Sequence, residues 1–120
     1  MESGIKVPQE TIQAFNQMKL KKACKYMILA IKGDVVTVAG QGSGDVEELY
    51  SSLPADDCAF VLYDTGRYVV LFMYAAPNAP TNSRTIYSTT KQTVEKALEG
   101  SKVYKHLVEE KDEIAEALKC

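Results

Sequence analysis

The chain has 120 residues, of which 46% are hydrophobic and 25% charged, a globular composition that argues against disorder. Its formal net charge of −2 gives no overall positive field, so we expect no nucleic-acid partner. No apolar run approaches the roughly 20 residues of a membrane span, and the polar start lacks the apolar core of a signal peptide. We therefore expect one cytoplasmic domain, residues 1–120.

The first half predicts a helix, a β-hairpin and a second, short helix. The first helix opens near Pro8, where the fixed φ of proline suits a first turn, and apolar side chains follow at helical spacing. Gly33 and Asp34 turn the hairpin, and Pro54 ends the short helix. The expected ranges are 8–22 for the first helix, 26–31 and 35–39 for the strands, 40–44 for a glycine-rich surface loop and 46–53 for the short helix.

The second half predicts another hairpin, a long helix, an edge strand and a terminal helix. Thr65 and Gly66 leave room for little more than a tight turn between two strongly apolar strands. The expected ranges are 58–64 and 67–76 for those strands, 80–100 for the long helix and 103–108 for the edge strand. Buried stripes are expected at Ile86, Thr90, Val94, Ala97 and Leu98 of the long helix and at Ile114, Ala115 and Leu118 of the terminal helix.

This order of elements predicts an α/β chain (an α+β mixed sheet) in which a central mixed β-sheet is sandwiched by helices. Three cysteines and the one histidine, His106, lack the spacing of zinc ligands and are too few for a disulfide framework. Cys24 and Cys58 begin apolar runs and are expected to be buried, whereas Cys120 is expected to be exposed. We expect no metal and no cofactor.

The segment 79–91 is the most informative of the chain. Pro80 suits a helix entrance, and the side-chain oxygen of Thr81, Asn82 or Ser83 could cap the first turn. Opposite the buried stripe lie Arg84, Ser88, Lys91 and Glu95. This basic face with small hydroxyl residues could receive a protein partner, and Arg84 could fork onto a carboxylate. The alternative is an ordinary solvated helix face.

Two short motifs raise an enzymatic alternative. Tyr87 and Lys91 have the Tyr-x-x-x-Lys spacing of short-chain dehydrogenases, and the glycines of 40–44 superficially resemble a phosphate-binding turn. However, the glycines follow the second strand of a hairpin, their spacing is not G-x-G-x-x-G, and the chain is about half as long as such an enzyme domain. We therefore expect no enzymatic activity, with Tyr87 packing its ring beside the core.

Taken together, these segments resemble the actin-depolymerising factor (ADF)/cofilin family over almost the whole chain. The strongest match is Ala79-Pro80, the basic Arg84 and Ile86-Tyr87-Ser88-Thr89-Thr90-Lys91, which is similar to the family's long actin-binding helix. Ser3-Gly4-Ile5 resembles its regulatory N-terminus, and Tyr63-Asp64 also fits. The resemblance implies an ADF-homology/gelsolin-like fold and a cytoskeleton-associated, monomeric protein that binds actin.

The resemblance also implies the site. The residues expected to contact monomeric actin are Ser3, Gly4, Ile5, Arg84, Thr85, Ser88 and Lys91, with Ser3 as a phosphorylation site. Phosphate on Ser3 would add roughly −1.5 to −2 charge and disfavour binding. Two departures stand out, because Asn82 replaces a basic residue and Glu2 replaces a small one.

A third departure concerns filaments. Typical members extend the second hairpin into a projecting basic loop that grips a filament, whereas 64–67 leaves nothing to project. We therefore expect strong monomer binding, promotion of depolymerisation and weak or transient filament binding, with Arg67 as a residual filament contact or a merely solubilising residue. Phosphoinositides could bind the cations of 19–25 and 84–91, which could equally be solvated. The alternatives are an ADF-homology adaptor acting on actin-related proteins and a small nicotinamide-cofactor enzyme.

Overall fold

The computed structural model describes residues 5–21, 24–44, 46–53, 56–98, 101–104, 107–109 and 111–118. Its elements in chain order are α1 (Gln9–Lys21), β1 (Tyr26–Lys32), β2 (Val35–Gly42), α2 (Val46–Ser52), β3 (Cys58–Asp64), β4 (Val69–Ala75), α3 (Thr81–Ala97), β5 (Ser101–Val103) and α4 (Lys111–Ala117). None of the described helices is both long and apolar enough to span a membrane.

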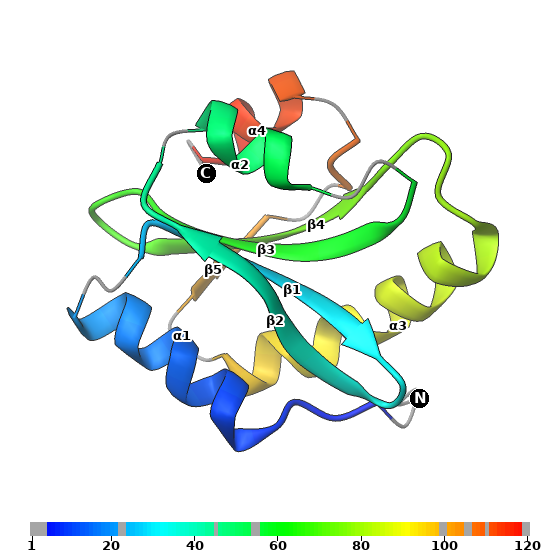
Figure 1. The fold of residues 1–120 in the computed structure, drawn as a ribbon, viewed down its shortest axis with the longest axis horizontal. Helices are drawn as coiled ribbons and strands as arrows, with labels where there is room; N and C mark the ends of the chain where they lie inside the picture. The colour runs from blue at the N-terminus through cyan, green and yellow to red at the C-terminus, as the bar shows by residue number, and fades with distance from the viewer. Residues whose placement is uncertain are drawn as a thin grey trace.

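The strands form one sheet in the order β2-β1-β3-β4-β5. Neighbours from β2 to β4 pair antiparallel, and β5 pairs parallel to β4. Helices α1 and α3 cover one face of the sheet, and α2 and α4 cover the other (Figure 1). The predicted mixed sheet between layers of helices is therefore confirmed.

The core lies on both faces of the sheet. Strands β3 and β4 are buried at every position, which explains why their sequences are apolar without alternation. Phe60 and Leu71 belong to the cluster under α1 and α3, whereas Phe72 belongs to the cluster under α2 and α4. Side chains of successive strand residues therefore point to opposite faces of the sheet. The side chains of β3 and β4 that point to one face form the core against which α3 packs.

The glycine run, predicted as a surface loop, is instead part of β2 as far as Gly42. Gly42 pairs with Tyr26 of β1, and a Cβ on it would lie 2.6 Å from the Tyr26 hydroxyl oxygen. The missing side chain lets the Tyr26 ring cross β2, so that its hydroxyl donates to Glu48 of α2 at 3.0 Å. Pairing with β1 therefore outweighs the weak strand propensity of glycine.

Two further expectations are corrected, and one is confirmed. The parallel edge strand is only Ser101–Val103, and beyond it Val108 makes an isolated bridge to Tyr74; residues 105–106 of the predicted range lie outside the described part. On α4, Ala115, expected to be buried, is exposed, and Ala117 is buried in its place. The buried face of α4 therefore runs through Ile114 and Ala117. The prediction that Cys24 and Cys58 are buried is confirmed, and Cys120 lies outside the described residues.

The turn between β3 and β4 is as short as predicted. Asp64 and Val69 form the last strand pair, so residues 65–68 make the whole connection. The Thr65 amide donates to the Tyr68 carbonyl at 3.0 Å, and Gly66 has a φ of 97°, which a side chain would strain. The β3–β4 hairpin therefore has no loop that projects beyond the end of the sheet.

Candidate functional site

The start of α3 differs from the predicted cap. Pro80 is the N-cap residue, in extended conformation with φ −61° and ψ 149°, and offers no capping side chain. Thr81 already lies inside the helix, one position too late to serve as the cap, so the predicted capping by Thr81, Asn82 or Ser83 is wrong. The Arg84 amide closes the first turn by donating to the Pro80 carbonyl at 3.1 Å.

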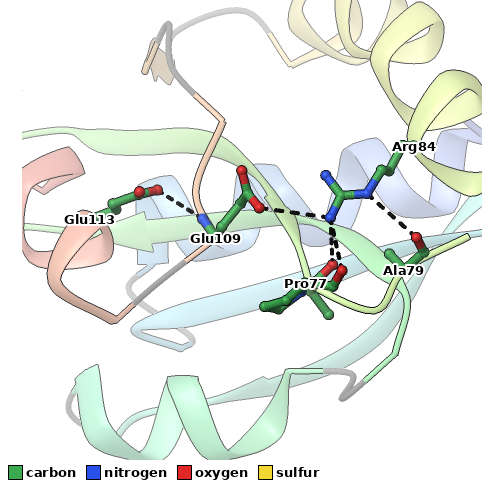
Figure 2. Close-up of polar contacts among 6 residues, drawn as sticks. Pro77, Ala79, Arg84, Glu109 and Glu113 are labelled. Carbon is green, nitrogen blue, oxygen red and sulfur yellow. Dashed lines mark hydrogen bonds and ion pairs between the residues drawn. The ribbon is translucent and has the colours of Figure 1, made fainter. Parts of the chain in front are cut away.

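The Arg84 side chain folds back over the turn that precedes α3. Its Nη2 donates to the carbonyl oxygens of Ala76 at 2.8 Å and Pro77 at 3.4 Å, and its Nε donates to that of Ala79 at 3.4 Å (Figure 2). A cation near a helix N-terminus is disfavoured by the helix dipole, and these carbonyl oxygens offset that cost. Arg84 thus stabilises the turn before α3 and is also a candidate contact for a partner.

A carboxylate completes the surroundings of this guanidinium. Glu109 Oε2 lies 3.7 Å from Arg84 Nη2, and the side chains are 43% and 29% exposed respectively. The Glu109 amide donates to Glu113 Oε2 of α4 at 2.8 Å, so one chain of contacts runs from α3 to α4 (Figure 2). Sequence reasoning missed Glu109, because an acidic residue before a helix is already explained by the helix dipole.

The other predicted residues of α3 follow the same side of the helix. Lys91 Nζ donates to the Tyr104 carbonyl at 3.1 Å, and Ser88 Oγ lies 3.8 Å from the sulfur of Met73. Thr85 is exposed on the neighbouring helix edge. The structure therefore brings Arg84, Thr85, Ser88 and Lys91 together along α3, with the two cations partly engaged by their own chain.

The buried stripe of α3 differs from the prediction at its first position, where it is displaced from Ile86 to Tyr87. Ile86 is 41% exposed, whereas Tyr87 is 5% exposed and packs its ring 5.2 Å from that of Phe60. Thr90, Val94 and Leu98 are buried as predicted, and Ala97 is partly buried. The packing of the Tyr87 ring beside the core is confirmed.

The Tyr87 hydroxyl explains this displacement. Pairing between β1 and β3 ends at Leu29 and Phe60, and two residues further on the same register would set Ile31 opposite Cys58. Instead the Ile31 amide donates to the Tyr87 hydroxyl at 2.9 Å, beside a cavity of about 510 Å³ that Tyr87 helps to line. Burial raises the pKa of the Tyr87 phenol, which keeps it protonated. The hydrogen bond fixes α3 to the end of β1.

The N-terminal arm reaches the same hairpin. The Lys6 amide donates to the Asp34 carbonyl, and the Val36 amide donates to the Lys6 carbonyl, each at 2.9 Å. Ile5 is partly buried against the core cluster under α1 and α3. Ser3 and Gly4 lie outside the described residues. Arm and α3 are therefore both anchored to the β1–β2 hairpin, although the two segments are far apart in sequence.

The candidate filament contact lies at the other end of the sheet. Arg67 is exposed in the β3–β4 turn, whereas α3 begins beyond the opposite end of β4, a strand about 20 Å long. Beside it, Lys102 Nζ lies 4.9 Å from the centre of the Tyr68 ring, a cation–π contact. The structure therefore separates Arg67 from the start of α3, where Arg84 lies.

The enzymatic alternative gains no support from this geometry. The Tyr87 hydroxyl and the Lys91 ammonium bind different backbone groups, those of Ile31 and Tyr104. Across the part of the chain that the structure describes, no three His, Cys, Asp or Glu side chains are grouped as metal ligands would be.

Comparison with known proteins gives one family. Residues 4–118 match the family described as cofilin/tropomyosin-type actin-binding protein. A relative named actin depolymerizing factor ADF from Toxoplasma gondii is 31% identical over 101 residues, covering 84% of this chain and 86% of its own. A cofilin/actin-depolymerizing factor homolog 1 from Plasmodium falciparum is 30% identical, covering 97% of this chain and 98% of its own.

Solved structures agree on the fold. Actin depolymerization factor 2 of Plasmodium berghei superposes with a TM-score of 0.85 at 18% identity, covering 100% of both chains. A cofilin from Streptomyces griseoflavus gives 0.82 at 22% identity, covering 93% of this chain and 91% of that one. With the family match spanning nearly all residues and the fold matching throughout, the chain belongs to the cofilin/tropomyosin-type actin-binding protein family.

Proposed function

We propose that this protein binds actin monomers and promotes the depolymerisation and turnover of filaments, with weak or transient filament binding, in the cytoplasm and at the cytoskeleton. The observation that carries the proposal is the contrast between the two ends of the sheet. Arg84, Thr85, Ser88 and Lys91 lie along α3, whereas the β3–β4 connection has only residues 65–68. Family membership supplies the partner, since the family is defined by actin binding.

The proposed monomer-binding surface consists of the arm and one side of α3. Its members are Ser3, Gly4, Ile5, Arg84, Thr85, Ser88 and Lys91. The anchoring of Lys6 and of Tyr87 to one hairpin supports a composite surface, because it limits how far the arm and α3 can move apart. Phosphorylation of Ser3, which would place negative charge on this surface, is proposed to weaken binding.

We expect weak filament binding because the β3–β4 hairpin has no projecting loop. A second contact surface raises affinity greatly only when both surfaces engage together. A four-residue turn with a single exposed cation, Arg67, offers little area for a second contact.

Phosphoinositide binding by the lysines of 19–25 and the cations of α3 is a secondary proposal. Among these lysines, Lys25 already makes a contact within the protein, because its Nζ lies 5.8 Å from the centre of the Tyr63 ring.

A charge placed on α3 tests the monomer site without disturbing the turn. Thr85 has an exposed side chain, so Thr85→Glu adds a negative charge there and should weaken binding of fluorescently labelled actin monomers by about tenfold or more. Ala115→Glu adds the same charge at an exposed position of α4 and should leave the affinity unchanged. Equal monomer affinities for Thr85→Glu and the parent would refute the α3 assignment.

A further inference from the structure

We propose that Glu109 is a built-in competitor for the partner: it neutralises Arg84 in the free protein, and monomer binding replaces it with a carboxylate of actin. The inference rests on the proposed function, because it concerns the same α3 surface. An acidic side chain of actin is the group that would replace Glu109, because a carboxylate forms the stronger, charge-assisted contact with a guanidinium.

The guanidinium is held in place by neutral groups. Its Nε and Nη2 donate to backbone carbonyl oxygens of residues 76–79, which fix its position without cancelling its charge. Among the described residues, Nη1 has no hydrogen-bond partner, so this nitrogen can still donate to an acceptor on a partner (Figure 2). Arg84 therefore presents a preorganised cation that does not move when its counter-ion changes.

The carboxylate of Glu109 is held loosely in comparison. Its Oε2 lies 3.7 Å from Arg84 Nη2, close enough for attraction but too far for a direct hydrogen bond. The Glu109 backbone is anchored separately, through its amide to Glu113 and through the neighbouring Val108 amide to Met73 at 3.0 Å. The carboxylate can therefore rotate into solvent while the chain stays in place.

The exposure of the Arg84–Glu109 ion pair sets how strongly Glu109 can compete with actin for Arg84. With side chains 29% and 43% exposed, solvent screens the attraction strongly. Measured pairs of this kind change equilibria by about 1.5- to fivefold, which is the gain in monomer affinity expected when the competitor is removed.

The test compares two variants that change the net charge equally. Glu109→Gln removes the competitor, and Glu116→Gln removes an exposed carboxylate on α4, so each takes the net charge from −2 to −1. Glu109→Gln should bind labelled actin monomers about 1.5- to fivefold tighter than Glu116→Gln at about 0.03 M salt. The difference should shrink at about 0.3 M salt, where the screening length falls from roughly 18 to roughly 6 Å.

The outcomes separate this inference from the proposed function. If the parent binds monomers and Glu109→Gln binds no tighter than Glu116→Gln, the competitor role is wrong and the proposed function stands. If the parent does not bind monomers, both fail. Thermal unfolding of each variant shows whether a lower affinity comes from misfolding, and a gain in affinity cannot come from that source.

Discussion

The hydrogen bond between Tyr87 and Ile31 gives the most direct test of how α3 is fixed to the sheet. Tyr87→Phe removes one oxygen and keeps the ring on Phe60. In the parent, the Ile31 amide nitrogen lies 2.9 Å from the Tyr87 hydroxyl oxygen, because its strand partner is lost where β1 and β3 separate. In the variant this amide has no acceptor among the described residues. We therefore expect the variant to fold with α3 less firmly attached to β1.

The expected loss can be estimated from the surroundings. An unsatisfied buried donor costs about 1–3 kcal/mol. Because Tyr87 lines a cavity of about 510 Å³, water can replace part of the lost contact, which places the expected loss near about 1–2 kcal/mol. For a chain of this size each kcal/mol lowers Tm by roughly 4 °C.

Urea unfolding followed by circular dichroism measures this loss. Tyr50→Phe is the matched control, because Tyr50 is partly buried with its ring edge against Tyr74 and has no described hydroxyl contact. We expect the control to lose less than about 0.5 kcal/mol. If Tyr87→Phe were as stable as Tyr50→Phe, the Ile31 amide would have another partner and the attachment of α3 would rest on packing alone.

Two further predictions concern stability. Gly42→Ala should cost roughly 1–3 kcal/mol in urea unfolding, because its Cβ would lie 2.6 Å from the buried Tyr26 hydroxyl, and unchanged stability would contradict the close approach. Burial raises the pKa of Cys24, Cys58 and Tyr87, so above about pH 8.5 the unfolded chain loses protons that the folded one keeps. Stability should therefore fall as pH rises through this range, and Cys24→Ala with Cys58→Ala should make the fall shallower; an unfolding free energy that stays constant up to about pH 10.5 would contradict it.

The sequence was most informative where one strong signal stood alone. Strand β3 has the predicted bounds because an apolar run ending at Asp64 and a Thr-Gly turn leave few alternatives. The prediction for the glycines of β2 is wrong because local propensity disfavours a strand there, whereas pairing with β1 continues through Gly40 and Gly42, and the Tyr26 ring requires a small residue at Gly42. Such requirements come from tertiary contacts that a local pattern does not contain.

The same limit applies to α3. Helical spacing alone fits a stripe through Ile86 as well as one through Tyr87, and the choice is made by the Ile31 amide on another element. Charge patterning placed Arg84 at the surface, but the carbonyl oxygens that hold it belong to a turn whose shape the sequence does not reveal. The candidate residues were therefore found, while their internal partners were not.

The central claim, a monomer binder with a reduced filament surface, is tested most directly by sedimenting actin filaments after incubation with the protein. Both proteins are quantified in pellet and supernatant over a range of concentrations. The account predicts that actin moves to the supernatant while little of this protein enters the pellet. Saturating co-sedimentation with the filaments would contradict it, and no effect on either fraction would favour an adaptor that acts on actin-related proteins.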